Sequence, residues 1–515
     1  MPQGPMDAGR AYDTVVIGSG VGGLFTGALL ATAGERVAVL ERHYAVGGYG
    51  HSFTRPGGWR FCAELHYVFN CGPGQDAGWI LQRLGLADHI AFTPLNPDGF
   101  DRIRFGNADG YDIVTGLGRN VERLASRYPA HRSGLQEYAH TLDRLTDELY
   151  DLPPGFNVWD VVRHPLRWRH VVGYRGWTLQ RLFDRLRFPL ELQAILAGQS
   201  MDIALPPAEA SLLIHAGNAT SYDRCACVPR HGFERLFDAV ADNIAARPGC
   251  AVRTRANVVA LKTRGRRVTA AVLKSGEEIA ADRFIYNGDP ALLPGLIRAA
   301  NADARLPRWF QRRLDYDYST SSFSIYLGLA GIDLAAHGFG NWNVWHYPVA
   351  DINRCYDEQI RQQRMDDPMV FLSTPTLHGT DVELAPPGGQ QLVLVTMADF
   401  DYFRRFAEQG RPAYRAEKER VADRILDVVE RHYVPGLRQH IVRKVVGTPL
   451  TNRRYVLAPA GNCYGQALTP ANIRLGRIDY RTPWPNLVLA GATAGVPSFG
   501  GGLHYARLLA ERLAR

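Results

Sequence analysis

The sequence predicts an α/β fold in which a Rossmann-like dinucleotide-binding domain carries an inserted α+β substrate domain and a helical lid. The β-branched run Tyr12–Ile17 leads directly into a glycine-rich turn and then into a segment rich in Ala and Leu, which is the order strand, turn, helix. The chain has 515 residues, of which 46% are hydrophobic. A chain of this length usually forms more than one compact core. We therefore expect inserts to interrupt the nucleotide-binding domain.

The glycine-rich turn has the spacing that a bound dinucleotide requires. Its glycines are Gly18, Gly20, Gly22 and Gly23. The first allows a tight turn, the second lets the backbone approach a pyrophosphate, and the third or fourth lets the helix pack closely on the strand with its N-terminus facing the phosphates. A second strand, residues 36–40, ends at Glu41, 19 residues beyond Gly22. An acid at this spacing meets the ribose hydroxyls and disfavours a ribose phosphate, so the pattern predicts dinucleotide binding.

A second pair of glycines favours FAD over NAD as the dinucleotide. Gly47 and Gly48 follow six residues after Glu41 and lead into His51 and Ser52. They would continue the backbone past the ribose toward the place of an isoalloxazine ring, which an NAD-binding fold does not need. The alternative interpretation is a flexible loop that contains two glycines.

The residues around this second pair resemble a known flavoprotein family. Residues 47–53, 58–61 and 65–67 are similar to the family of phytoene desaturases, carotenoid cis-trans isomerases and retinol saturases. The similarity favours the isomerase and saturase branch, in which a His-Tyr pair occurs at this place. Further blocks follow in the family's order at residues 229–232, 287–290, 385–388, and 489–491 with 499–502.

This resemblance implies an FAD-binding domain of the GR2 or amine-oxidase type. In the family the backbone near Val258 faces the adenine. The N-terminus of the last helix points at the pyrimidine end of the flavin, where its partial positive charge stabilises the anionic reduced form. The implied cofactor-binding residues are Gly18, Gly20, Gly22, Gly23, Glu41, Arg42, Gly47, Gly48, His51, Ser52, Val258, Gly491, Gly501 and Gly502.

The same order of blocks divides the chain into interleaved parts. The expected discontinuous FAD-binding domain comprises residues 10–110, 225–290 and 480–515. Residues 111–224 form a helical insert that prolines break into short helices, and we expect it to act as a lid that faces a membrane. Residues 291–479 supply the substrate-domain sheet and its helices. The strands expected there are residues 319–329, 370–373 and 391–397, and the expected helix is residues 412–433.

Catalysis at a flavin needs mainly a dry slot beside the flavin N5 and one group that exchanges a proton. The resemblance implies a strand over residues 61–67 that runs along the flavin. The family pattern of this strand is Phe-Asp-x-Gly-x-His-Tyr, whereas this chain has Cys62 in place of the Asp and Glu64 in place of the Gly. In an apolar slot, loss of hydration raises the pKa of a carboxyl group, so we predict that Glu64 acts as an acid or base near neutral pH. The alternative is that Glu64 turns outward or pairs with an arginine.

Two histidines are further catalytic candidates. His66 matches the family position, and His504 lies on the last helix, from which it could converge on the same pocket. Either could shuttle protons or orient the substrate, and either could instead be structural. Cys225 and Cys227 lack the partners of a zinc site, so we expect no metal.

The charge pattern argues against a nucleic-acid partner and favours contact with a membrane surface. The net charge of +8 comes without any nucleic-acid-binding motif. Residues 151–190 hold seven arginines against three acids, interleaved with tryptophans, which suits a bilayer surface; the alternative is a solvated lid. Seven scattered cysteines, with no signal-peptide-like or membrane-spanning run, predict a cytoplasmic protein with peripheral contact at the inner membrane surface.

These features predict an FAD-dependent oxidoreductase that acts on C=C or C–C bonds of a long apolar polyene or isoprenoid-like substrate. Desaturation, saturation and isomerisation all remain open, and the carboxyl at position 64 favours acid- or base-assisted rearrangement over simple dehydrogenation. A second GxGxxG is missing, so the external electron donor or acceptor is expected to be oxygen, a quinone or a separate reductant. The alternatives are a flavin amine oxidase and a non-enzymatic prenyl- or lipid-binding escort protein on the same scaffold.

Overall fold

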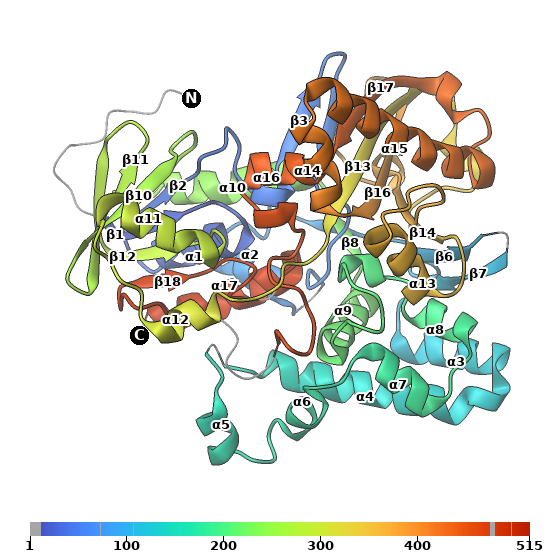
Figure 1. The fold of residues 1–515 in the computed structure, drawn as a ribbon, viewed down its shortest axis with the longest axis horizontal. Helices are drawn as coiled ribbons and strands as arrows, with labels where there is room; N and C mark the ends of the chain where they lie inside the picture. Colours follow the sequence, from blue (N-terminus) through green and yellow to red (C-terminus); the bar gives the residue numbers. More distant parts are fainter. Residues whose placement is uncertain are drawn as a thin grey trace.

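The computed structural model describes residues 12–72, 74–106, 108–153, 155–473, 479–495 and 497–514. Two large sheets, two pairs of short strands and a helical insert make up most of this part of the chain. Figure 1 shows the two sheets on opposite sides of the molecule, with the helices of the insert gathered beneath the second sheet. Each of the two large sheets combines strands from widely separated parts of the sequence, as expected for a nucleotide-binding domain that carries inserts.

The first sheet has the parallel core of a dinucleotide-binding fold. Its strands, in order, are β10 (Val258–Arg264), β11 (Arg267–Leu273), β12 (Glu278–Tyr286), β1 (Tyr12–Ile17), β2 (Val37–Leu40) and β9 (Ala251–Arg253), with β18 (Leu487–Leu489) also paired to β12. β1 pairs in parallel with β2 and β12, while β11 is antiparallel to both of its neighbours. Val15 and Val16 are fully buried in different cores, which is why β1 has a continuous apolar run.

Helices cover both faces of the first sheet. One face is covered by α1 (Val21–Thr32), α2 (Asp76–Leu84), α10 (Gly232–Ala245) and α17 (Phe499–Leu513), and the other by α11 (Leu293–Ala300) and α12 (Arg308–Arg313). Phe25 of α1 meets Phe499 of α17 edge to face, with ring centroids 6.2 Å apart. The first and last helices of the described chain therefore share one core.

The second sheet presents one apolar face to helices and one mixed face to the interior. Its strands, in order, are β17 (Ile441–Gly447), β13 (Ser321–Ala330), β16 (Gly389–Ala398), β15 (Val370–Ser373), β14 (Asn343–Tyr347), β6 (Asp101–Phe105) and β7 (Ala108–Ile113). Phe323 and Ile325 of β13 pack into the core formed with α14 (Phe400–Glu408) and α15 (Arg411–His432). Because side chains alternate along a strand, Ser322 and Ser324 point to the opposite face.

The helical insert lies against this interior face. It consists of α3 (Leu117–Arg127), α4 (Arg132–Tyr150), α5 (Val158–Arg163), α6 (Arg169–Tyr174), α7 (Leu179–Leu186), α8 (Leu190–Leu196) and α9 (Leu212–Arg224). The remaining elements are the hairpin β3 (Ser52–Arg55) and β4 (Trp59–Cys62), the pair β5 (Phe92–Pro94) and β8 (Cys227–Pro229), and helices α13 (Ile352–Tyr356) and α16 (Pro449–Val456). Within the described ranges, no helix combines the length and apolar character that crossing a bilayer requires.

The structure differs from the expected element and part boundaries at three places. The strand expected to run from residue 61 to residue 67 ends at Cys62, and the backbone then turns away so that Glu64 N–H bonds to the Tyr49 carbonyl. β6 pairs in parallel with β14, and β7 pairs with β6, so both strands belong to the second sheet, although residues up to 110 were expected in the nucleotide-binding part and residues from 111 onward in the helical insert. α11 and α12 pack on the first sheet, which extends that part beyond residue 290.

Substitution of Gly22 by Ala is expected to destabilise the fold. An added Cβ would overlap the carbonyl oxygen of Ala490 and lie 3.1 Å from Asn287 Oδ1. Overpacking of this kind typically costs ~1–3 kcal/mol. The matched control is Gly118→Ala, since Gly118 is also helical and nothing lies within 4 Å of its added Cβ. Thermal unfolding should show a lower midpoint for Gly22→Ala alone, and equal midpoints would contradict this close approach.

Candidate cofactor and active site

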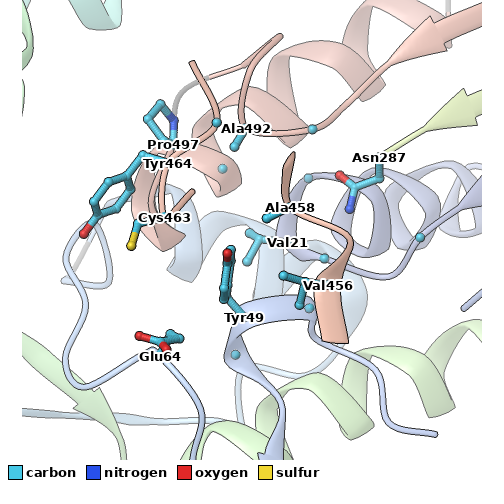
Figure 2. Close-up of a pocket in the computed structure, with 18 of the residues that line it drawn as sticks. Val21, Tyr49, Glu64, Asn287, Val456, Ala458, Cys463, Tyr464, Ala492 and Pro497 are labelled. Carbon is cyan, nitrogen blue, oxygen red and sulfur yellow. The ribbon is translucent and has the colours of Figure 1, made fainter. Parts of the chain in front are cut away.

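A cavity of about 630 Å³ extends from the carboxyl ends of the parallel strands in the first sheet to the interior face of the second sheet. The segments that follow β1, β2 and β12 line one end, which is where α/β folds bind ligands. Figure 2 shows the wall between the two ends, with Asn287 toward the nucleotide side and Glu64 toward the other. We call this space the main cavity.

Three chain segments cross at the glycine-rich turn. The Gly23 N–H donates to Asn287 Oδ1 at 2.9 Å. A Cβ at Gly20 would lie 2.7 Å from Asn287 Nδ2, and a Cβ at Gly22 would overlap the Ala490 carbonyl oxygen. Only glycine permits this packing, which leaves the first turn of α1 lining the cavity. The N-terminus of a helix in this position binds a pyrophosphate through its free N–H groups.

Glu41 lies in the cavity wall where the sequence places the ribose. It is 7% exposed, and its carboxylate accepts hydrogen bonds from the Ser19 N–H at 2.9 Å, the Ser19 hydroxyl at 2.7 Å and the His43 N–H at 2.7 Å. Arg42 also lines the cavity, and its guanidinium donates to the carbonyls of Arg454 and Tyr455. These contacts hold the acid in a fixed orientation and tie the 454–455 segment to the nucleotide end.

The second glycine pair touches the first glycine-rich turn. Gly47 and Gly48 have φ of 106° and 59°, and a Cβ at Gly48 would lie 3.2 Å from the Cα of Gly20. Both glycines line the main cavity, as does His51, whose Nδ1 is 2.7 Å from the Gly48 carbonyl oxygen. Ser52 begins β3 and is not among the residues that line the cavity.

The C-terminal glycines bring a second helix N-terminus to the same space. Gly491 and Gly502 line the main cavity, as does Val258 from the first sheet. Gly501 instead lines an adjoining cavity of about 300 Å³, and its N–H donates to the Ser498 hydroxyl at 3.1 Å. Two helices, α1 and α17, therefore begin at the nucleotide end of the main cavity.

The end of the main cavity that faces the second sheet is apolar. Trp345, Phe371, Val395 and Met397 come from three strands of that sheet and line this end. All four side chains belong to the large core that the sheet forms with the helical insert. Such a wall can enclose a hydrocarbon chain but offers few hydrogen bonds to water.

Glu64 faces this apolar region, and no arginine of the described ranges forms an ion pair with it. Its carboxylate accepts hydrogen bonds from the hydroxyls of Ser322 and Ser324, each at 3.2 Å. Burial raises the pKa of Glu64 to about 7, with the two serines acting in the opposite direction. Figure 2 shows the carboxylate on the same side of the cavity as Cys463 and Tyr464. The group can therefore both hold and release a proton near neutral pH.

His66 also lines the main cavity, but as a neutral group. Burial lowers its pKa to about 3, and the nearby His378 acts in the same direction. Within the described residues, its Nε2 has no hydrogen-bond partner. His66 is thus available to orient a ligand by hydrogen bonding, whereas a role as a protonated acid at neutral pH is disfavoured.

His504 does not join Glu64 and His66 in the main cavity, contrary to the convergence expected from the sequence. It lines the adjoining cavity, and its Nδ1 is 2.9 Å from the Asp76 carboxylate. Burial raises the pKa of the Asp76 carboxyl, but the hydrogen bond and charge of His504 outweigh it, and Arg507, which pairs with Asp76 at 3.0 Å, also helps to lower this pKa below its usual value. On α17, His504 follows Gly502 by two residues, so its side chain lies on a different side of the helix from Gly502 and faces the adjoining cavity.

Several site residues were not found from the sequence. Asn287 bridges the glycine turn, Ser322 and Ser324 bind Glu64, and residues 455–465 form a wall of the cavity. Asn287 lies within block 287–290, one of the blocks that resemble the flavoprotein family. The alternation of side chains along a strand predicts that Ser322 and Ser324 lie on one face of the sheet. Nothing in the local pattern of residues 455–465 indicates that they reach the nucleotide end.

The nucleotide end of the cavity fits a flavin dinucleotide. Glycines from four segments form its walls where Cβ atoms would intrude or where φ is positive. The two helix N-termini suit phosphate and flavin oxygens, and Glu41 suits a ribose. Ala256, Asn257 and Val258 line the same end of the cavity, where the Ala256 N–H donates to the Glu41 carbonyl at 2.8 Å.

Comparison with known proteins agrees with this geometry. The chain matches the family described as flavin containing amine oxidoreductase over residues 21–514. It is 26% identical over 531 residues to all-trans-retinol 13,14-reductase from Danio rerio, covering 95% of this chain and 84% of the relative. It is 24% identical over 481 residues to chloroplastic prolycopene isomerase from Daucus carota, covering 88% and 72%.

The fold is also similar to that of cyclohexylamine oxidase from Brevibacterium oxydans, with a TM-score of 0.59, 14% identity, and coverage of 98% of this chain and 100% of that one. The predicted fold class, flavoprotein resemblance and oxidoreductase class are confirmed by these matches. The chain belongs to the flavin-containing amine oxidoreductase family.

Proposed function

We propose that this protein is an FAD-dependent oxidoreductase acting on C=C or C–C bonds of a long apolar polyene or isoprenoid-like molecule. The observation that carries the proposal is the continuity of one cavity, from a glycine-walled nucleotide end to an apolar end that contains Glu64. The names of the relatives support the substrate class, since one describes the reduction of a retinol and another the isomerisation of a lycopene. The first sheet would hold the FAD, and the second sheet with the helical insert would enclose the substrate.

FAD is favoured over a flavin mononucleotide by the extent of the nucleotide end. Glu41 and residues 256–258 line the cavity beyond the glycine-rich turn, where an adenosine would lie. A mononucleotide would leave this part of the cavity without a ligand. The flavin supplies hydride acceptance or donation at its N5 atom when bound.

The protein's own residues supply the proton and the dry environment. The Glu64 carboxyl, held by Ser322 and Ser324, would give a proton to a substrate carbon in saturation, take one in desaturation, and do both in isomerisation. Neutral His66 would orient the substrate. The aromatic and aliphatic side chains of the second sheet would exclude water from the reacting carbons.

We also propose that the helical insert contacts a membrane through α5 and the turn after it. Val158, Trp159, Val162 and Leu166 are 55%, 66%, 62% and 74% exposed. Exposed arginines flank them, including Arg163, and arginine near an anionic bilayer contributes about 1 kcal/mol. Figure 1 shows α5 at the outer edge of the insert.

This surface lies next to the adjoining cavity, which suggests a route for an insoluble substrate. Leu152 and Phe156, just before α5, line that cavity, as do Val171 and Arg175 of the segment that follows. The adjoining cavity also shares wall residues with the main cavity, among them Phe69. A molecule that leaves the bilayer at α5 would therefore pass through the adjoining cavity to reach the main one.

Glu64→Gln is expected to lower polyene turnover by about 10²- to 10⁴-fold, because a positioned acid or base contributes that much. The purified variant should keep its flavin absorption bands and release FAD on denaturation. Exposed Glu419, which pairs with Lys444, provides the matched control Glu419→Gln with unchanged turnover. Unaltered turnover in Glu64→Gln, or peroxide-producing turnover of amines in place of polyenes, would contradict the proposal.

The pH profile should report the protonation state of Glu64. Below pH ~7 the carboxyl is protonated and above it is ionised, because burial raises its pKa to about 7. Saturation, which needs the proton, should therefore slow above pH ~7, and desaturation should slow below it. The profile of kcat/KM checks this, and Glu64→Gln should remove the inflection. An inflection that persists in the variant would assign the titration to another group.

Membrane contact is tested by sedimentation with vesicles of phosphatidylserine and phosphatidylcholine. The pair of substitutions Trp159→Ser and Leu166→Ser should lower the bound fraction by at least about tenfold, since burial of each side chain contributes ~1.5–3 kcal/mol. Trp309→Ser is the control, because Trp309 is 44% exposed but lies on α12. Equal binding by both variants and the parent protein would exclude α5 as the contact surface.

A further inference from the structure

The two cavities meet at a cluster of buried carboxyl groups that the proposed chemistry does not use. Asp202, at the end of the short helix η3 (Ser200–Asp202), lines both cavities. The Tyr67 hydroxyl lies 2.8 Å from Asp101 Oδ2 and 3.2 Å from Asp202 Oδ2, so one phenol bridges the two acids. Asp101 is fully buried at the start of β6.

The bridging phenol has only one proton to give, which determines the state of Asp202. The shorter contact assigns that proton to Asp101, which also accepts a hydrogen bond from Gln199 at 2.6 Å. The contact between Asp202 and Tyr67 then needs a proton on Asp202. Consistently, burial and the negative charge of Asp101 raise the pKa of Asp202 to about 8.

Asp202 is therefore a neutral carboxylic acid in an apolar wall. Its hydroxyl can donate to Tyr67 while its carbonyl oxygen accepts, and Tyr222 also hydrogen-bonds to the group. Nearby parts of the wall are apolar, including Phe69 and Met201. A neutral carboxyl group has one O–H donor and lone pairs on both oxygens, so at least one lone pair remains beside the contacts with Tyr67 and Tyr222 to accept a hydrogen bond from a ligand in the cavity.

Resting on the polyene function proposed above, we propose that Asp202 binds the hydroxyl group of a polyene alcohol and thereby positions the substrate in the main cavity. A hydroxyl donates one hydrogen bond and accepts others, which matches a neutral acid beside two phenols. A pure hydrocarbon would leave the free acceptor position of Asp202, which Tyr67 and Tyr222 do not fill, without a partner, and an unfilled position of this kind costs free energy in a site shielded from water. To pair with an amine cation, Asp202 would have to lose its proton. Two carboxylates, those of Asp101 and Asp202, would then share the single proton of the Tyr67 phenol, which is unfavourable.

The test compares three ligands of one carbon skeleton on the flavin-loaded protein. These are all-trans-retinol, the hydrocarbon with a methyl group in place of the alcohol carbon, and the corresponding primary amine. Perturbation of the flavin absorption spectrum gives the Kd of each. The parent protein should bind the alcohol about fivefold to tenfold more tightly than the hydrocarbon, as expected for one net hydrogen bond.

Two variants and a control separate positioning from folding. Asp202→Leu should reduce the preference for the alcohol to less than twofold, while Asp202→Asn, which keeps a donor and an acceptor, should retain most of it. Asp88→Asn, at an exposed aspartate, should leave the preference unchanged. If Asp202→Leu does not fold, Asp202→Ala takes its place with the same expected loss of the preference, and a preference retained in Asp202→Ala overturns the proposal.

The outcomes that overturn the proposal differ from those that overturn the polyene function. Equal binding of alcohol and hydrocarbon by the parent protein removes Asp202 as an anchor but leaves a polyene oxidoreductase. Tighter binding of the amine shows that the cluster is a cation site. Failure of all three ligands to bind, with binding of unrelated amines instead, overturns the polyene function and this proposal together.

Discussion

The close approach of three backbone segments at the glycine-rich turn is the constraint on which the site depends. Gly20, Gly22 and Gly23 lie so close to Asn287, the Ala490 carbonyl and the Gly18 carbonyl that no Cβ fits at any of the three positions without displacement. This contact aligns the ends of β1, β12 and β18 and aims the N-terminus of α1 at the cavity. The nucleotide end is thus created by packing that only glycine allows.

The main cavity joins a polar end and an apolar end in one continuous space. At the nucleotide end, backbone N–H groups and helix N-termini stabilise negative charge. At the other end, burial favours the neutral form of every ionisable side chain discussed. It raises the pKa of Glu64 to about 7 and of Asp202 to about 8, and lowers that of His66 to about 3. A water-poor chamber that favours neutral forms in this way suits an apolar ligand better than an ionic one.

Features that depend on neighbouring residues could be predicted well. β1 was predicted with its observed bounds, because the strand, turn and helix follow one another in the chain. Glu41, which the sequence predicts as a ribose ligand, lines the main cavity. Glu64 was expected in an apolar slot, and the structure places it there. The partners Ser322 and Ser324 could not be predicted, since they lie more than 250 residues away, as the separations of 258 and 260 show.

The sequence by itself determined the dinucleotide-binding motif and the class of fold, because glycine spacing and apolar alternation act over a few residues. Tertiary structure alone decided that His504 faces the adjoining cavity, that residues 101–113 join the second sheet, and that Asp202 meets Asp101 across Tyr67. These outcomes depend on how distant segments pack against one another. Burial and proton sharing arise only from that packing, so no local pattern encodes them.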